Sequence, residues 1–474
     1  MRVAVIGGGV VGTLVARELS RYEGEVLLFE REPDVGWGVT KANSAIVHAG
    51  FHERLGTLCA RFCVEGNALF PEVCRELEVP FQDIGGFVLA LADGEKTVVE
   101  ALHAQGVEIG VPGLVLLAQD EVRAQVPHVN PDVVAALWAP TVGITEPWGL
   151  AVAAAENACA NGASLHVGEE VKGIAVAKGQ VRAVTTDCTT YKVDAVVNAA
   201  GLYADRIAAL VGVSTPRLIP RRGEYLLLVD VPSELRTAVL FPIPTPHSKG
   251  ILVVPTVDGA LLLGPTAANL SPEGKGATET TARGLVRILA GARRLVPELP
   301  VGKAVKAFAG LRPEPEDGDF WLGDTSVRRF YQAAGMRSPG LTAAPAVARW
   351  LAEEIAADLS LAPRPSFDPV RPALPHAANL PLEKWEKLIA ADRRFGRVVC
   401  RCNQVTEGEI VAAVARGART LDGVKFRTRA GFGRCQGGFC TDAILAILAR
   451  ELETGPENIG IRGPASALIV GRVR

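Results

Sequence analysis

The sequence predicts an α/β fold: a discontinuous, Rossmann-like nucleotide-binding domain with an inserted α+β domain built on an antiparallel sheet, and a small helical domain with a metal centre at the end. Three observations predict it. A strand–glycine turn–helix pattern occurs three times, two blocks of short apolar strands separate its occurrences, and four cysteines cluster near the end of the chain. Because 474 residues exceed what one hydrophobic core usually holds, we expect about three domains.

The composition is that of a globular protein, with 48% hydrophobic and 22% charged residues. A formal net charge of −2 argues against a general nucleic-acid-binding protein, which normally has a strongly basic face. No apolar run approaches the roughly 20 residues that span a bilayer, and Glu18 and Arg21 stand where a signal peptide would stay apolar. We therefore expect a cytoplasmic protein, which would associate with a membrane only through partner subunits.

The first strand–turn–helix unit covers residues 3–30. An apolar strand leads directly into Gly7, Gly9 and Gly12, which have the spacing GxGxxG, and helical periodicity follows. The first glycine allows a tight turn, the second lets backbone N–H groups approach a pyrophosphate, and the third lets helix and strand pack closely. Glu30 ends the next strand, where its carboxylate can accept hydrogen bonds from ribose hydroxyls. The unit therefore predicts a dinucleotide site.

A loop of small and polar residues, 36–50, comes next. Thr40, Asn43 and Ser44 offer side chains suited to phosphate, ribitol or an isoalloxazine ring, so we expect this loop to lie on a ligand. Segment 57–77 then returns to helical periodicity and is predicted to pack in the core.

Two further strand–turn–helix units follow, at 193–212 and 330–355. The helix of the last unit is expected to start near Leu341, so that its free N–H groups face an electron-rich ring oxygen. The intervening blocks of short apolar strands predict an antiparallel sheet. We accordingly assign 1–80, 145–215 and 307–360 to the nucleotide-binding domain, and 81–144 and 216–306 to the substrate domain.

The prolines between 361 and 397 predict an extended linker, followed by a terminal domain at 398–474. This domain contains Cys400, Cys402, Cys435 and Cys440 in two loops that each lead into a helix. Soft thiolate ligands select Zn²⁺ or an iron–sulfur cluster, and CxC is the weaker zinc signal. A [2Fe–2S] cluster is the favoured interpretation, with zinc and plain thiols as alternatives.

The first 360 residues resemble the D-amino-acid-oxidase-type FAD-dependent oxidoreductases, and within them the glycerol-3-phosphate and L-2-hydroxyglutarate dehydrogenases. The segments that carry the resemblance are VIGGGVVG, KANSAIVHAGFH, VVNAAGLYAD, RRGEYLLL, KGILVVPT, LLLGPTA, FAGLRP and GMRSPGLTAAPA. The tail resembles the [2Fe–2S] domain of bacterioferritin-associated ferredoxin, as it occurs fused to the large subunit of anaerobic glycerol-3-phosphate dehydrogenases, although CxxxxC replaces the CxxC of the stand-alone ferredoxin.

The resemblance implies an enzyme that oxidises sn-glycerol 3-phosphate to dihydroxyacetone phosphate and passes electrons through a [2Fe–2S] cluster to a redox partner subunit. A 2-hydroxy acid or a secondary amino acid is the alternative substrate, because an Arg-lined anion site serves all three. A non-catalytic electron-transfer subunit is the alternative from another class. Whether the flavin is held covalently through His48 is left open.

Dehydrogenation of an alcohol at a flavin needs a base for the hydroxyl proton and a cation for the acidic end of the substrate. The catalytic candidates are His48 and His52 on their chemistry, and Tyr225 and Arg312 because the resemblance implies a role for them at the substrate. The candidates for substrate binding are Lys249 and Arg337. The residues expected to contact FAD are Gly7, Gly9, Gly12, Glu30, Arg31, Thr40, Asn43, Ser44, Val171, Ala199, Gly201, Gly310, Gly335, Ser338, Gly340, Leu341 and Thr342.

Overall fold

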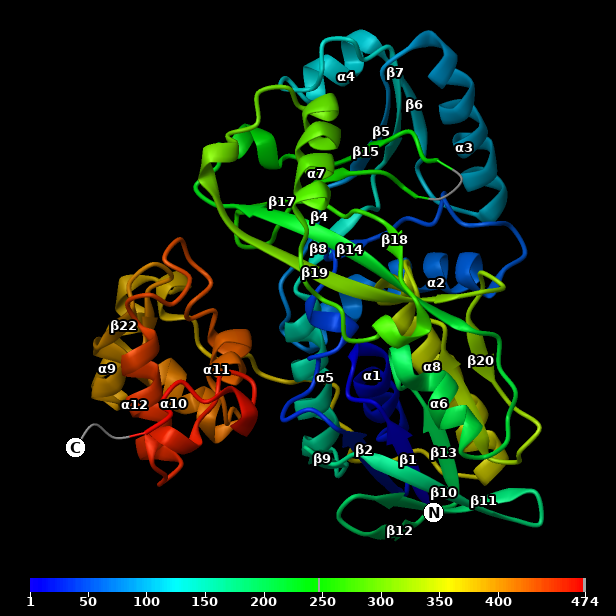
Figure 1. Ribbon diagram of the computed structural model, residues 1–474, viewed down its shortest axis with the longest axis vertical. Helices are drawn as coiled ribbons and strands as arrows, with labels where there is room; N and C mark the ends of the chain where they lie inside the picture. The colour runs from blue at the N-terminus through cyan, green and yellow to red at the C-terminus, as the bar shows by residue number, and fades with distance from the viewer. Residues whose placement is uncertain (246–247, 472–474) are drawn as a thin grey trace. The chain divides into compact units, whose positions relative to one another are not determined.

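The computed structural model describes residues 1–245 and 248–471, so that 472–474 of the predicted terminal domain lie outside it. The chain forms two compact units (Figure 1). The first consists of 1–30 and 35–371, and the second of 31–34 and 372–474.

A six-stranded, mostly parallel sheet forms the centre of the first unit, in the order β20–β21–β13–β1–β2–β9. It brings together strands that are far apart in the sequence, because Val5 pairs with Val197 and Val197 with Tyr331. Central strands of a parallel sheet are covered on both faces, so their sequences are continuous apolar runs. Residues 3–6 (VAVI) and 195–197 (AVV) are such runs, and all of them are buried. The strands are β1 (Arg2–Ile6), β2 (Glu25–Glu30), β9 (Ser164–Val167), β13 (Ala195–Asn198), β20 (Trp321–Gly323) and β21 (Phe330–Ala334).

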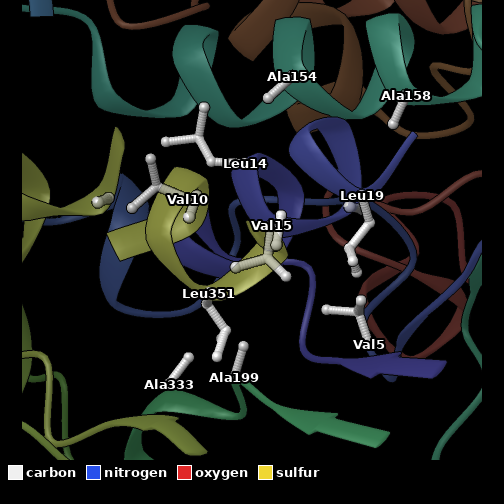
Figure 2. Close-up of a cluster of buried hydrophobic side chains, with 14 of the residues drawn as sticks. Val5, Val10, Leu14, Val15, Leu19, Ala154, Ala158, Ala199, Ala333 and Leu351 are labelled. Atoms are coloured by element: carbon white, nitrogen blue, oxygen red, sulfur yellow. The ribbon is translucent and has the colours of Figure 1, made fainter. Parts of the chain in front are cut away.

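Helices cover one face of this sheet and a small antiparallel sheet covers the other. Alternate side chains of β1 and β2 explain the two layers, because Val5 faces the helices whereas Ala4 faces the small sheet. Figure 2 shows Leu14 of α1 between Ala154 of α5 and Leu351 of α8. The elements are α1 (Val10–Leu19), α2 (Leu58–Glu76), α5 (Pro147–Ala160) and α8 (Gly340–Leu359), and β10 (Val171–Ala177), β11 (Gln180–Thr186) and β12 (Thr190–Lys192).

A second sheet, with nine strands in the described part of the chain, is antiparallel except for the parallel pair β5 and β15. Its longest pair joins β14 to β19, so the boundary predicted at 306/307 falls inside β19. The strands are β5 (Gly86–Ala90), β6 (Val115–Ala118), β7 (Ala135–Ala139), β14 (Leu218–Leu228), β15 (Val239–Pro242), β16 (Leu252–Pro255), β17 (Leu261–Gly264), β18 (Ala268–Asn269) and β19 (Ala304–Pro315).

One face of this sheet packs on a helix and the other on the loop predicted to lie on the ligand. Ile288 and Leu295 of α7 (Ala282–Leu295) are fully buried against the first face. Phe51, which follows that loop, packs with Phe241 and Tyr225 on the second face. The remaining elements of this unit are β3 (Ile46–Val47), β4 (Phe81–Asp83), β8 (Gly143–Thr145), α3 (Lys96–Ile109), α4 (Gln119–Gln125) and α6 (Ala204–Ala209).

The second unit is small and helical, with its own core around Ile410, Val424 and Leu448. Thr406 and Glu409 form a capping box at the start of α10. The predicted linker, 361–397, contains the helix α9 and overlaps this unit, which begins at Pro372. The elements are α9 (Leu382–Ala391), β22 (Val398–Cys400), β23 (Val405–Thr406), α10 (Glu407–Ala415), α11 (Leu421–Thr428) and α12 (Thr441–Glu451).

Within residues 1–245 and 248–471, no helix is both long enough and apolar enough to cross a membrane.

Candidate active site and cluster site

The turn between β1 and α1 has the geometry that a dinucleotide needs. The N–H of Gly8 donates to Oε2 of Glu30 at 2.7 Å, and the N–H of Val10 donates to Oγ1 of Thr40 at 3.0 Å. The first turn of any helix has further N–H groups that the helix itself does not satisfy. These groups and the carboxylate of Glu30 are suited to a pyrophosphate and a ribose, respectively.

The glycines of this turn differ in what surrounds them. A Cβ on Gly7 would lie 2.4 Å from the carbonyl oxygen of Ala199, and one on Gly12 would lie 1.9 Å from that of Gly7. Both positions are therefore closed to any side chain by the fold itself. A Cβ on Gly9 would meet only Oγ1 of Thr40, at 3.3 Å, which leaves space for a ligand to approach the backbone. The residues present thus fit the adenosine diphosphate end of FAD.

The loop at 36–50 is fixed from several sides. A Cβ on Gly310 would lie 1.8 Å from the carbonyl oxygen of Ala42, so β19 touches the loop directly. Asn43 shapes the loop itself, since it donates to the carbonyl of Thr40 and accepts from the N–H of Ala45, both at 2.7 Å. At the start of α8, Oγ1 of Thr342 accepts from the N–H of His48 at 2.8 Å.

The other residues expected at FAD lie in five separate segments of the chain. Arg31 is exposed and pairs with Glu32 at 3.3 Å, and Ser44 is half-buried in the loop. Two short turns and one strand hold the rest: Ala199 and Gly201 follow β13, Val171 begins β10, and Gly335, Ser338, Gly340 and Leu341 lie between β21 and the first turn of α8. Their contacts with the cofactor remain predictions.

Two histidines lie at the end of this loop: His48 is buried and His52 is half-buried. Nε2 of His48 lies 3.3 Å from Oγ of Ser338, and the rings of His52 and Phe241 have centroids 5.6 Å apart. Burial, followed by the nearby charge of Lys249, lowers the pKa of His48 well below its ordinary value. The same causes lower the pKa of His52 to about 3. Both imidazoles are therefore neutral near pH 7, the form in which a histidine accepts a proton.

Lys249 and Arg337, predicted to bind the substrate, meet at a carboxylate. Nζ of Lys249 lies 2.7 Å from Oε1 of Glu53, and Nη1 of Arg337 lies 3.2 Å from Oε2. Nη2 of Arg337 also donates to the carbonyl of Gly318 at 2.9 Å, and Nη1 donates to the carbonyl of Ser338. Lys249 comes from the segment before β16 and Arg337 from the turn before α8, so the fold joins distant parts of the chain here.

Arg312 and Tyr225 lie on the paired strands β19 and β14. Nη2 of Arg312 donates to the carbonyl of Thr266 at 2.8 Å, and burial lowers the pKa of this guanidinium, which remains charged. Tyr225 is 3% exposed and stacks on Phe308 with ring centroids 4.9 Å apart. Burial raises the pKa of Tyr225, so its hydroxyl stays protonated. Tyr225 is thus a packing residue of the sheet that also lies near the charge of Arg312.

Glu53 is the site residue that sequence reasoning missed. In the sequence it precedes Arg54 in a polar segment, HERLG, which has the composition of an exposed loop. In the structure its side chain is only 3% exposed. The one signal in the sequence is its position directly after His52, which is a catalytic candidate.

The four clustered cysteines form two pairs. Sγ of Cys402 lies 3.5 Å from Sγ of Cys435, and the side chains of Cys400 and Cys440 are hydrogen-bonded to each other. Each pair takes one cysteine from CxC and one from CxxxxC. A Cβ on Gly433 would lie 2.3 Å from Cβ of Cys402, so the two loops touch.

This arrangement fits a binuclear cluster better than one ion. Four thiols in two pairs supply the all-sulfur ligand set of a [2Fe–2S] centre. All nine cysteines of the chain are free thiols.

The dinucleotide turn and the adjoining group of basic side chains and neutral histidines define the class of protein as a flavin-type oxidoreductase. Residues 2–354 match the family model described as FAD dependent oxidoreductase, and residues 398–450 match the BFD-like [2Fe-2S] binding domain. The chain belongs to the FAD dependent oxidoreductase family, and its cofactors are FAD and a [2Fe–2S] cluster.

Relatives and solved structures agree with this assignment. Glycerol 3-phosphate dehydrogenase of Caloramator mitchellensis is 44% identical over 456 residues, which are 95% of this chain and 94% of that one. Human mitochondrial L-2-hydroxyglutarate dehydrogenase is 27% identical over 74% of this chain and 88% of its own. The structure of dithionite-reduced L-α-glycerophosphate oxidase from Mycoplasma pneumoniae with FAD bound aligns with a TM-score of 0.73 and 28% identity, covering 78% of this chain and 98% of that one.

Proposed function

We propose that this protein oxidises sn-glycerol 3-phosphate to dihydroxyacetone phosphate and delivers the electrons, through its [2Fe–2S] cluster, to a redox partner subunit. The observation that carries the proposal is the cation pair Lys249 and Arg337 beside two neutral histidines. An alcohol with an anionic end needs these two kinds of group together. The relative from Caloramator mitchellensis, which spans nearly the whole chain, has the same activity in its name.

Each group has a distinct role in this proposal. Lys249 and Arg337 hold the phosphate, and Arg312 adds a third positive charge that orients the substrate. His48 or His52, in the neutral form, takes the hydroxyl proton. His48 is the stronger candidate, because its backbone is fixed by Thr342 and its ring by Ser338. FAD, when bound, accepts the hydride from the carbinol carbon.

The terminal unit supports the proposed redox partner. Cys402 is exposed, and Phe439, directly before Cys440, is 84% exposed. Lys425, Arg429 and Arg434 lie within residues 423–441, which contain no acidic residue, whereas Arg427 in the same segment is buried in an ion pair with Asp34. A basic surface with an exposed aromatic ring next to a one-electron centre suits an acidic electron-transfer protein.

An anaerobic titration of the purified holoenzyme tests the proposal. We expect sn-glycerol 3-phosphate to bleach the flavin absorbance, and the cluster spectrum to change as electrons reach it. L-2-hydroxyglutarate, L-lactate and L-proline serve as parallel probes for the alternative substrate classes. Bleaching by one of these but not by glycerol 3-phosphate would overturn the substrate assignment, and bleaching by none of the four would favour a non-catalytic electron-transfer subunit.

A further inference from the structure

Glu53 is a buried carboxylate that lies between the two cations assigned to the substrate. Three groups donate to it: Nζ of Lys249 at 2.7 Å, Nη1 of Arg337 at 3.2 Å and Sγ of Cys59 at 3.3 Å. Its side chain is 3% exposed, so these contacts replace water almost completely. A carboxylate buried this deeply is retained only with charged or hydrogen-bonding partners.

Glu53 remains ionised at all pH values at which the enzyme would work. Burial opposes ionisation, but the charges of Lys249 and Arg337 outweigh it and bring the pKa of Glu53 down to about 2. The carboxylate is therefore a permanent negative charge at the site. It does not exchange protons in a reaction near neutral pH.

The two cations depend on Glu53 to different degrees. Arg337 also donates to the carbonyls of Gly318 and Ser338, and its Nε lies 3.5 Å from Oε1 of Glu314. Lys249 has no other hydrogen-bond or ion-pair partner among the residues that the structure describes. This one contact holds the long, flexible side chain of Lys249 in place. Ordering that side chain costs conformational entropy, which the contact must offset.

We propose that Glu53 is a positioning residue of the substrate site, which fixes the ammonium group of Lys249 beside Arg337 and so builds a two-cation receptor for a dianionic head group. This inference rests on the proposed function and adds a residue that the substrate itself need not touch. Lys249, Arg337 and Arg312 carry three positive charges and Glu53 one negative charge, so the four side chains retain a net charge of +2. That charge matches a phosphate ester, which carries between one and two negative charges at pH 7.

The variant Glu53→Gln tests the inference because it keeps the shape of the side chain and removes its charge. The amide oxygen can accept from one cation, but the amide NH₂ group then faces the other and cannot accept from it. Glu65→Gln is the matched control, since Glu65 is an exposed residue of α2 whose ion pair with Arg61 lies at the surface. Thermal unfolding, followed by flavin fluorescence, shows whether each variant is folded.

We expect Glu53→Gln to lower the limiting rate of flavin bleaching by glycerol 3-phosphate at least tenfold, because the phosphate is no longer held in one orientation. The rate with glycerol, which has no anionic end, should change by less than about threefold. The dissociation constant of inorganic phosphate, measured by perturbation of the flavin spectrum, should also change by less than about threefold. The loss of a positioned Lys249 weakens phosphate binding, whereas removal of the negative charge of Glu53 strengthens it, so the two effects oppose each other. Glu53→Asp, which keeps the charge, should recover part of the rate.

Three results would overturn the inference. They are an unchanged rate in Glu53→Gln, an equal loss with glycerol and with glycerol 3-phosphate, and a large loss of phosphate binding at an unchanged rate. The second would mark a general structural defect, and the third a simple binding contact. If glycerol 3-phosphate fails to bleach the flavin of the unaltered enzyme, the proposed function is wrong and the inference falls with it. If glycerol 3-phosphate bleaches the flavin of the unaltered enzyme and Glu53→Gln bleaches at the same rate, only the inference about Glu53 is contradicted.

Discussion

The N–H of Gly8 donates a 2.7 Å hydrogen bond to Oε2 of Glu30, across the turn that joins β1 to α1. The bond holds the carboxylate against the glycine turn. A Cβ on Gly8 would lie 2.9 Å from Cβ of Glu30, which shows how closely the two segments approach.

Loss of the Glu30 carboxylate should therefore weaken FAD binding. We expect Glu30→Ala to raise the dissociation constant of FAD about 10- to 100-fold, the range of a charge-assisted hydrogen bond of about 1.5–3 kcal/mol. Reconstitution of the apoprotein, followed by quenching of FAD fluorescence, measures it. Glu25→Ala removes a carboxylate at the other end of β2, where it pairs with Arg2 at the surface, and should leave the affinity unchanged.

Gly310 should tolerate no side chain, because a Cβ there would lie 1.8 Å from the carbonyl oxygen of Ala42. We expect Gly310→Ala to displace the loop at 36–50, to destabilise the first unit by about 1–3 kcal/mol and to lower the flavin content of the purified protein. Flavin-to-protein absorbance ratios and thermal unfolding test this. Gly302→Ala, at a position with open space around it, is the control. Equal flavin content in the two variants would contradict the assigned contact.

His48 and His52 should make the first unit sensitive to acid. Their pKa values in the folded protein lie below 6.5, so below pH 6.5 the unfolded chain binds more protons than the folded one. Their contribution to stability is present above that pH and is lost as the pH falls, by about 1.4 kcal/mol per pH unit for each histidine. Glu53 adds to the loss only below about pH 4.5, because its folded pKa is about 2.

The variant His52→Gln isolates one half of this effect. Between pH 7.5 and 5.5, its unfolding temperature should fall less steeply than that of the unaltered protein, as measured by the release of flavin fluorescence. His128→Gln, at an exposed position, should follow the unaltered protein. Parallel curves for all three proteins would show that His52 is not held in the neutral form.

Replacing a cysteine of the cluster should separate the two redox functions. We expect Cys435→Ser to lower the iron content and the visible absorbance of the cluster, because one sulfur of the pair with Cys402 is lost. Flavin content and bleaching by the substrate should persist, since all the residues assigned to them except Arg31 lie in the first unit. Cys188→Ser, an exposed thiol of that unit, is the control. Loss of flavin bleaching in Cys435→Ser would contradict this separation.

Local sequence patterns predicted the parts of the fold that depend on neighbouring residues. The glycine turn and the start of α8 near Leu341 follow from the spacing of a few residues, and the structure has both. The parallel pairing of β5 with β15 could not be predicted, because about 150 residues separate the two strands and neither has a distinctive pattern.

The site shows the same division. The histidines, the lysine and the arginines were predicted because their chemistry suits the reaction, and their roles stay predictions. Their common partner, Glu53, was not found, because it is buried only after distant segments meet around it. A charged residue in a polar segment looks exposed until the long-range contacts are known.

The attachment of Lys249 to a segment outside the strands has an evolutionary consequence. The cofactor end of the site is fixed by glycines that admit no side chain, whereas Lys249 precedes β16 and is held by one contact. Under the proposed role of Lys249, exchange of a few residues in that segment changes which anion is recognised and leaves the glycines of the cofactor turn untouched. One scaffold then diverges towards new substrates at little risk to its redox chemistry.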